Sequence, residues 1–179
     1  YDMSILTADN IISGVHKKPL KTCVNEEVNY KNNKMTLEQE VEGNQAKMIY
    51  LFDDTNSMSG KLEAYKNGEL ISIMQIKNFL PEGEVKMFYP SGKLLSEVTF
   101  KNDKEVGVLK GYSENGKLEG EIPYNNGVVE GIVKVYHENG KVSEEVTFKN
   151  GKKNGPMKIY DENGNLKRQS NFVDDRQVD

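Results

Sequence analysis

The sequence has little of the chemistry that most enzymes and metal proteins use. It contains one cysteine, Cys23, two histidines and no tryptophan in 179 residues. A single cysteine excludes an intrachain disulfide and any metal cluster built from several cysteines. Neither His16 nor His137 stands in a motif that pairs it with a nucleophile and an orienting group. We therefore expect a protein with no catalytic residues, no metal and no cofactor.

Long apolar runs and an excess of basic charge are also missing. Hydrophobic residues make up 36% of the chain, and its 24 basic and 28 acidic residues are interleaved, with a net charge of -4. Nucleic acids and anionic lipids bind basic surfaces, and a membrane-spanning helix needs about 20 apolar residues. We therefore expect no nucleic acid among the partners and no membrane association of this segment.

The start of the chain bears on localisation. Residues 1–10 have neither the basic nor the apolar region of a signal peptide, and the first residue is Tyr1 instead of Met. Removal of an upstream signal would leave such a start. We expect an exported protein, periplasmic or at the cell surface.

What the sequence does have is an internal repeat of 24 residues. Several columns of similar residues keep this one period. The columns include Gly83, Gly107, Gly131 and Gly155; Gly92, Gly116, Gly140 and Gly164; and Phe88, Tyr112, Tyr136 and Tyr160. Columns in phase over several units are typical of repeat proteins whose units share one continuous core.

Each unit has the pattern of a β-hairpin. In the unit from Gly131 to Gly151, two strand-length runs are separated by Asn139-Gly140 and closed by Asn150-Gly151. Asn-Gly provides the positive φ angles that tight hairpin turns need. The same pair begins at Asn67, Asn115, Asn126, Asn154 and Asn163. We predict an all-β fold, an elongated single-layer antiparallel sheet of successive β-hairpin repeats.

The repeat divides the chain into four segments. Residues 59–172 form the regular repeats, and residues 28–58, where the pattern decays, form degenerate hairpins. Residues 1–27 show no repeat, which is typical of the irregular cap that seals the end of a solenoid. Residues 173–179 are expected to be a frayed C-terminal tail.

Alternation along the strands separates an apolar face from a polar one. The apolar column is Val85, Leu109, Val133 and Met157. The polar face carries a lysine column, Lys86, Lys110, Lys134 and Lys158, and a second column, Glu97, Glu121, Glu145 and Gln169. If the register places these two columns opposite each other, each unit offers one cross-strand ion pair.

The aromatic column is predicted to lie at strand ends on the same side as the lysines. We expect this side to be the more accessible one and to contact the partner through Phe88, Tyr112, Tyr136, Tyr160, Lys86, Lys110, Lys134 and Lys158. The alternative is that the aromatic rings only stabilise the sheet by cross-strand packing. His137 is expected to be a solvated turn residue.

Two short patterns suggest ligands but fit the repeat better. Gly111–Lys117 is similar to a phosphate-binding loop, yet Leu118 replaces the Ser or Thr that would hold magnesium. Asp161–Asn165 is rich in oxygen ligands but lacks the spacing of a calcium loop. We interpret both as turns.

The columns resemble the bacterial variant of the MORN (membrane occupation and recognition nexus) repeat, most clearly at residues 107–118 and 131–142. The resemblance implies an elongated sheet of hairpins without catalytic residues. Members of this variant family are often described as antitoxins of toxin–antitoxin pairs. The chain departs from the eukaryotic form in having no tryptophan and fewer glycines per unit.

Two functions of different classes are compatible with these patterns. The first is a non-enzymatic protein-binding module, including the antitoxin or immunity-type partner of a bacterial effector. The alternative is an exported structural or cell-surface protein that binds envelope components. An apolar face of this size must be covered. Curling of the sheet, the N-terminal segment, a second copy in a homodimer and the partner are the candidates.

Overall fold

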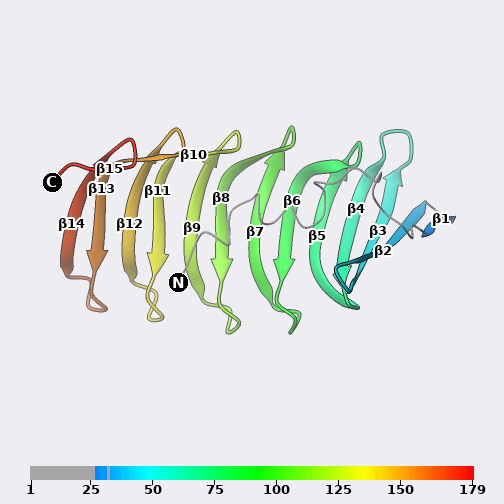
Figure 1. The fold of residues 1–179 in the computed structure, drawn as a ribbon, viewed down its shortest axis with the longest axis horizontal. Coiled ribbons are helices and arrows are strands. Elements are labelled where there is room, and N and C mark those ends of the chain that lie inside the picture. Colours follow the sequence, from blue (N-terminus) through cyan, green and yellow to red (C-terminus); the bar gives the residue numbers. More distant parts are fainter. Residues whose placement is uncertain (1–26, 32) are drawn as a thin grey trace.

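One antiparallel sheet makes up the described part of the molecule. The computed structural model describes residues 27–31 and 33–179 (Figure 1). The strands in these residues are β1 (Glu27–Lys31), β2 (Lys34–Val41), β3 (Asn44–Asp54), β4 (Ser59–Lys66), β5 (Glu69–Lys77), β6 (Leu80–Phe88), β7 (Leu94–Lys101), β8 (Lys104–Tyr112), β9 (Leu118–Asn125), β10 (Val128–Val129), β11 (Gly131–Tyr136), β12 (Val142–Lys149), β13 (Lys152–Tyr160), β14 (Leu166–Val173) and β15 (Arg176–Gln177).

Fourteen of these fifteen strands lie side by side in chain order, and β10 pairs only with β9. Within the described residues there is no helix, and hence none that could cross a membrane. The predicted all-β sheet of successive hairpins is confirmed. The predicted N-terminal cap, residues 1–27, lies outside the described residues except for Glu27.

Two kinds of turn join the strands, one at each edge of the regular repeats. At one edge, two-residue turns such as Asn126–Gly127 have positive φ at both positions, 47° and 82°. At the other edge the turns are longer: Gly116 N donates to Ser113 O at 2.9 Å, and Gly116 takes a φ of 84°. Asn115 has no positive φ there, so the prediction of a left-handed asparagine is wrong for this second kind of turn.

One predicted Asn-Gly turn is also wrong. Asn154 and Gly155 lie inside β13, and Gly155 has a φ of 110°. There the register between β12 and β13 shifts, between Val146 and Phe148. A shift of this kind is a β-bulge, which bends a strand and often uses glycine. Thus glycine in this column serves a bend, not a turn.

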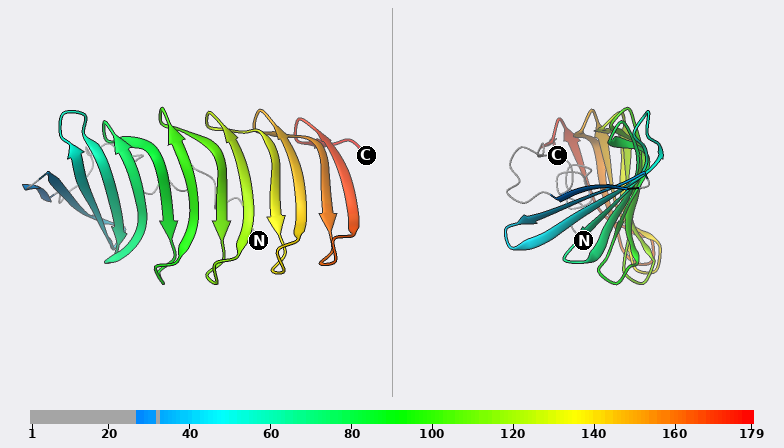
Figure 2. Two further views of the ribbon diagram at one scale, coloured as in Figure 1. Left: turned by 180° about the vertical axis from the view of Figure 1, so that it is seen from behind. Right: turned by 90° about the vertical axis from the view of Figure 1, so that its right-hand side faces the viewer.

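Equivalent shifts recur between β5 and β6 and between β7 and β8, beside Gly83 and Gly107. Because the bend repeats from unit to unit, the strands arch together and the sheet is curved when viewed along its length (Figure 2). Curling of the sheet was one of the four candidate covers for the apolar face, and the described strands show a curved sheet.

The side chains of the apolar face are most deeply buried in the middle of the array. Val85 and Leu109 of the predicted apolar column are buried, together with Met74, Val98 and Phe100. Val133 and Met157 of the same column are only half-buried. The column that begins with Met74 and Val98 ends at Ser170 in the last repeat unit. The apolar character of this face therefore decreases towards the C-terminal edge.

The C-terminal residues continue the sheet instead of fraying. Asp174 and Asp175 form a turn with φ of 45° and 69°, and β15 then pairs with the end of β14. Val178 N donates to Asn171 O at 2.9 Å, and the Asp179 carboxylate accepts from Asn171 N at 3.1 Å. The expected frayed tail is therefore paired from residue 176 to residue 179.

Candidate functional site

The eight predicted partner-binding side chains lie on alternate strands of the regular repeats. Their aromatic members, Phe88, Tyr112, Tyr136 and Tyr160, are the last residues of β6, β8, β11 and β13. Their basic members, Lys86, Lys110, Lys134 and Lys158, lie two residues earlier in the same strands. Lys110 is exposed and the other seven are half-buried. The structure thus brings all eight together on neighbouring strands.

The register places the lysine and glutamate columns directly opposite each other. Successive Cα partners across the sheet run Lys86, Glu97, Lys110, Glu121, Lys134, Glu145, Lys158 and Gln169. We call these eight residues the charge row. Strands in a sheet are about 4.8 Å apart, so positive and negative side chains alternate at about that spacing. The predicted opposition of the two columns is confirmed.

The predicted ion pairs across the charge row are replaced by other contacts. Glu97 Oε1 accepts a hydrogen bond from Tyr112 Oη at 2.8 Å, and Glu121 accepts one from Tyr136 in the same way. Lys86 Nζ lies 3.1 Å from Glu84 on its own strand. Among the described residues, no lysine Nζ of the charge row lies within 4.0 Å of a glutamate oxygen of the charge row. The carboxylates therefore hold the tyrosines in place.

These contacts shift the ionisation of both tyrosines. Burial raises the pKa of Tyr112 and of Tyr136 to about 12, aided by the hydrogen bond to Glu97 or Glu121 and by the charge of that carboxylate. The folded pKa exceeds the usual value of 10, so the protonated hydroxyl is the form that the fold stabilises. This stabilisation is complete below pH 10 and is lost as the pH rises towards 12.

We predict that NMR titration of the tyrosine ring carbons shows Tyr112 and Tyr136 ionising at about pH 12. Glu97→Gln removes the carboxylate charge but leaves an acceptor, so the pKa of Tyr112 should fall while that of Tyr136 changes less. An unchanged Tyr112 pKa in this variant would show that the Glu97 contact does not operate in solution.

Hydrogen bonds between neighbouring turns form a second, unpredicted set of contacts. Tyr89 Oη donates to Tyr112 O at 2.7 Å, and His137 Nε2 lies 2.9 Å from Tyr160 O. Tyr89 and His137 are two repeats apart, in the column Tyr89, Ser113, His137 and Asp161. Their shared position in the 24-residue period is the sequence signal that could have predicted equivalent contacts for the two residues. His137 is thus half-buried and bonded to the next turn, not the solvated residue that we expected.

The two ligand-like patterns take part in turns. Asp161 Oδ1 accepts from Asn165 N at 2.8 Å and from Asn163 N at 2.9 Å, and these bonds, the one from Asn165 most, lower the pKa of the Asp161 carboxyl. Gly111–Lys117 leads from β8 through a turn into β9. In the described residues no group of three His, Cys, Asp or Glu side chains is placed to hold a metal ion.

Comparison with known families agrees with this geometry. The family model described as "MORN repeat variant" matches residues 81–102, 105–126, 129–150 and 153–174. The chain belongs to the MORN repeat variant family. Each MORN match starts near the N-terminal end of one strand and ends in the next two-residue turn, so it covers one hairpin. A search of curated proteins finds no match to this chain.

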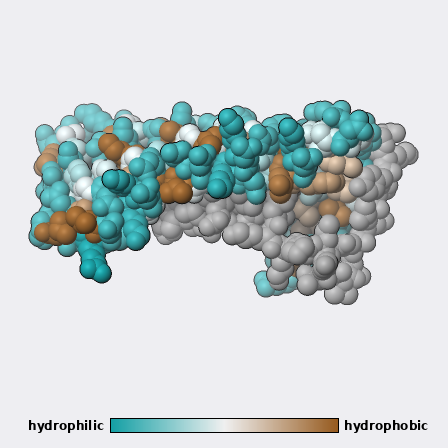
Figure 3. Space-filling model, turned by 90° about the horizontal axis from the view of Figure 1, so that it is seen from above, coloured by the Kyte–Doolittle hydropathy of each residue, from teal (hydrophilic) through white to brown (hydrophobic). Residues whose placement is uncertain are grey.

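The MORN assignment concerns a repeat module and not a catalytic domain. Seen from above, at the edge of the two-residue turns, the surface of the described residues is mostly hydrophilic, with separate hydrophobic patches (Figure 3). Val128 and Leu80 belong to the exposed hydrophobic residues, at 42% and 47% exposure. The charge row with its tyrosines is the most regular candidate site on this MORN array.

Proposed function

We propose that this MORN array is a non-enzymatic protein-binding module whose recognition surface is the charge row together with Tyr112 and Tyr136. The single observation that carries the proposal is the strict alternation of lysine and glutamate in register across neighbouring strands. A polyanion on this surface would meet three carboxylates interleaved with the four ammonium groups. A protein surface with both charge signs is the better complement.

The tyrosines support the same proposal. Their hydroxyls are already bonded to Glu97 and Glu121, so their rings are held in one orientation before any partner arrives. Ordered aromatic side chains lose little conformational entropy on binding, and aromatic residues are enriched among binding hot spots. Stoichiometric masking of a partner, as in an antitoxin or immunity-type protein, is the form of binding that we propose.

Affinity capture with matched charge variants tests this function. Lys110→Glu with Lys134→Glu would leave five successive acidic residues in the charge row, and recovery of the partner protein from a lysate of the source organism should fall at least about tenfold. Lys104→Glu with Lys152→Glu makes the same charge change at exposed positions beside the two-residue turns and should leave recovery unchanged. Equal recovery by the two variants would contradict the proposal.

A further inference from the structure

One column of contacts between neighbouring turns is interrupted in the middle of the array. Tyr89 and His137 each reach the backbone carbonyl of the strand residue that precedes the next turn, Tyr112 or Tyr160. Ser113 occupies the same column between them. Its hydroxyl stays within its own turn, where it accepts from Lys117 N at 3.2 Å and bonds to Asn115. A serine side chain is too short to span to the next turn as tyrosine and histidine do.

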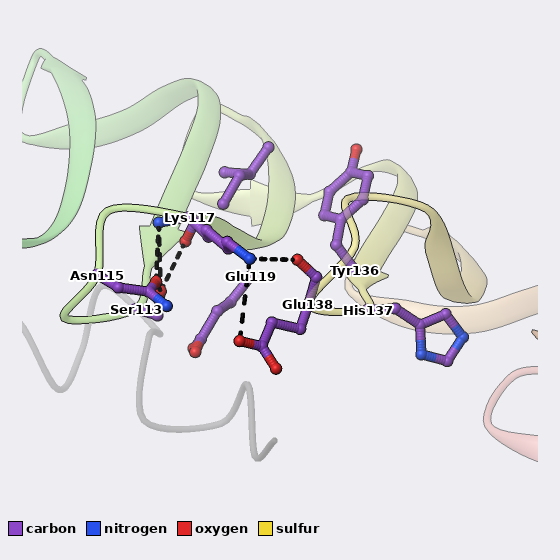
Figure 4. Close-up of a pocket in the computed structure, with 8 residues that line it drawn as sticks. Ser113, Asn115, Lys117, Glu119, Tyr136, His137 and Glu138 are labelled. Carbon is purple, nitrogen blue, oxygen red and sulfur yellow. Dashed lines mark hydrogen bonds and ion pairs between the residues drawn. The ribbon is translucent and has the colours of Figure 1, made fainter. Parts of the chain in front are cut away.

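A hollow of about 290 Å³ lies at this gap, between the β8–β9 turn and the β11–β12 turn (Figure 4). The lining includes Ser113, Lys117, Glu119, Tyr136 and Glu138. Its volume is at the lower limit for small-molecule pockets. The hollow therefore has room for one side chain or a ligand of that size.

The carboxylates of the hollow outnumber its lysine. Lys117 Nζ is held at the side of Glu138, 3.0 Å from the backbone oxygen and 3.9 Å from Oε1 (Figure 4). Glu119 Oε2 is buried and has no hydrogen-bond partner. The lysine that lies nearest in sequence is thus engaged elsewhere, and the Glu119 carboxylate keeps an unused acceptor.

Glu119 is the only acidic residue of its column, which is apolar in the two preceding units and polar in the two following ones. The corresponding residues of the other units are Ile71, Leu95, Ser143 and Lys167. Like them, Glu119 is the extra residue at a register shift, here between Gly111 and Tyr112. Leu95 uses this position to pack against the apolar core. An acidic residue here adds nothing to such packing and leaves a buried acceptor that a donor must satisfy.

We propose that this hollow binds one cationic group, an ammonium or a guanidinium, on the carboxylate of Glu119. Such a group supplies both the missing donor and the opposite charge. We identify that group with a Lys or Arg side chain of the partner protein, and this identification rests on the proposed function. The affinity of the hollow for a cation does not depend on the proposed function.

Titration of the full chain with N-acetyl-arginine amide, followed by amide NMR shifts, tests the site. We expect saturable shifts centred on residues 113–119 and 136–138, and none with the uncharged N-acetyl-glutamine amide. Glu119→Gln keeps the shape of the side chain but removes its charge, so the affinity should fall at least about tenfold. Glu114→Gln, an exposed neighbour outside the hollow, should bind like the wild type.

A second variant closes the hollow without removing the carboxylate. Ser113→Tyr places in the gap the side chain that position 89 uses to reach the next turn, so the fold should persist and the binding should be lost. Shifts that survive both Glu119→Gln and Ser113→Tyr, equal binding of the uncharged amide, or no saturable shift in the wild type would each overturn the site. Cation binding that needs Glu119 supports the site even where no partner protein is captured. Failure of the proposed function can therefore be distinguished from failure of the cation site.

Discussion

Replacing Tyr112 and Tyr136 together by alanine should weaken binding of the partner by more than about 2 kcal/mol, which is roughly a 30-fold rise in Kd. Both rings lie at strand ends on the polar side, half-buried, so the fold should survive their removal. The expected loss is large because each alanine removes a ring that a carboxylate has already positioned. Calorimetric titration of the captured partner measures the change, and circular dichroism checks the fold.

The Tyr112→Phe and Tyr136→Phe pair is the matched control for this prediction. It keeps the rings and removes only the bonds to Glu97 and Glu121. If the rings make the contact, this pair should lose much less affinity than the alanine pair. An alanine pair that binds normally, or that unfolds, would show that the tyrosines are structural and that recognition takes place elsewhere.

Gly60→Ala should be the most damaging single methyl addition in the array, with a loss of at least about 3 kcal/mol in the free energy of unfolding. Gly60 lies in β4 opposite Phe52, where a Cβ would come within 2.0 Å of Leu51 O and 2.9 Å of Phe52 Cα. Both are backbone atoms of β3, so relief requires the strands to separate. Urea unfolding followed by circular dichroism measures the loss.

Gly68→Ala is the control for Gly60→Ala. Gly68 has a φ of 82° and no atom within 4 Å of an added Cβ, so alanine there meets only the strain of a left-handed residue, about 1–2 kcal/mol. Equal losses at the two positions would show that the close approach of β3 and β4 at Gly60 is absent in solution.

The sequence was sufficient to predict the repeats, the two faces and the opposition of the lysine and glutamate columns. These features follow from a period of 24 and from side-chain alternation, both of which are visible in one dimension. Lys134 and Glu145, for example, belong to the two runs of one hairpin, and its turn brings them opposite each other. For such local pairs the hairpin alone sets the register.

The contacts beyond the hairpins could not be predicted in the same way. Tyr136 bonds to Glu121, which is on β9 of the preceding unit, and nothing in either strand alone indicates that choice over the opposite lysine. The Asp174–Asp175 turn contains no glycine, so the sequence lacks the Asn-Gly pair that would have predicted the pairing of β15 with β14. Gly155 follows Asn154 as in a turn, although its positive φ belongs to a bulge.

Site-specific photo-crosslinking tests the central claim, that the charge row, and not the edge of the two-residue turns, is the protein-binding surface. Val108 lies in β8, two residues before Lys110 and on the same face, and is 43% exposed. Val128 follows a two-residue turn and is 42% exposed. A photoreactive benzophenone residue at position 108 should crosslink to the captured partner, and the same residue at position 128 should not. Crosslinking from position 128 and not from position 108 would contradict the account.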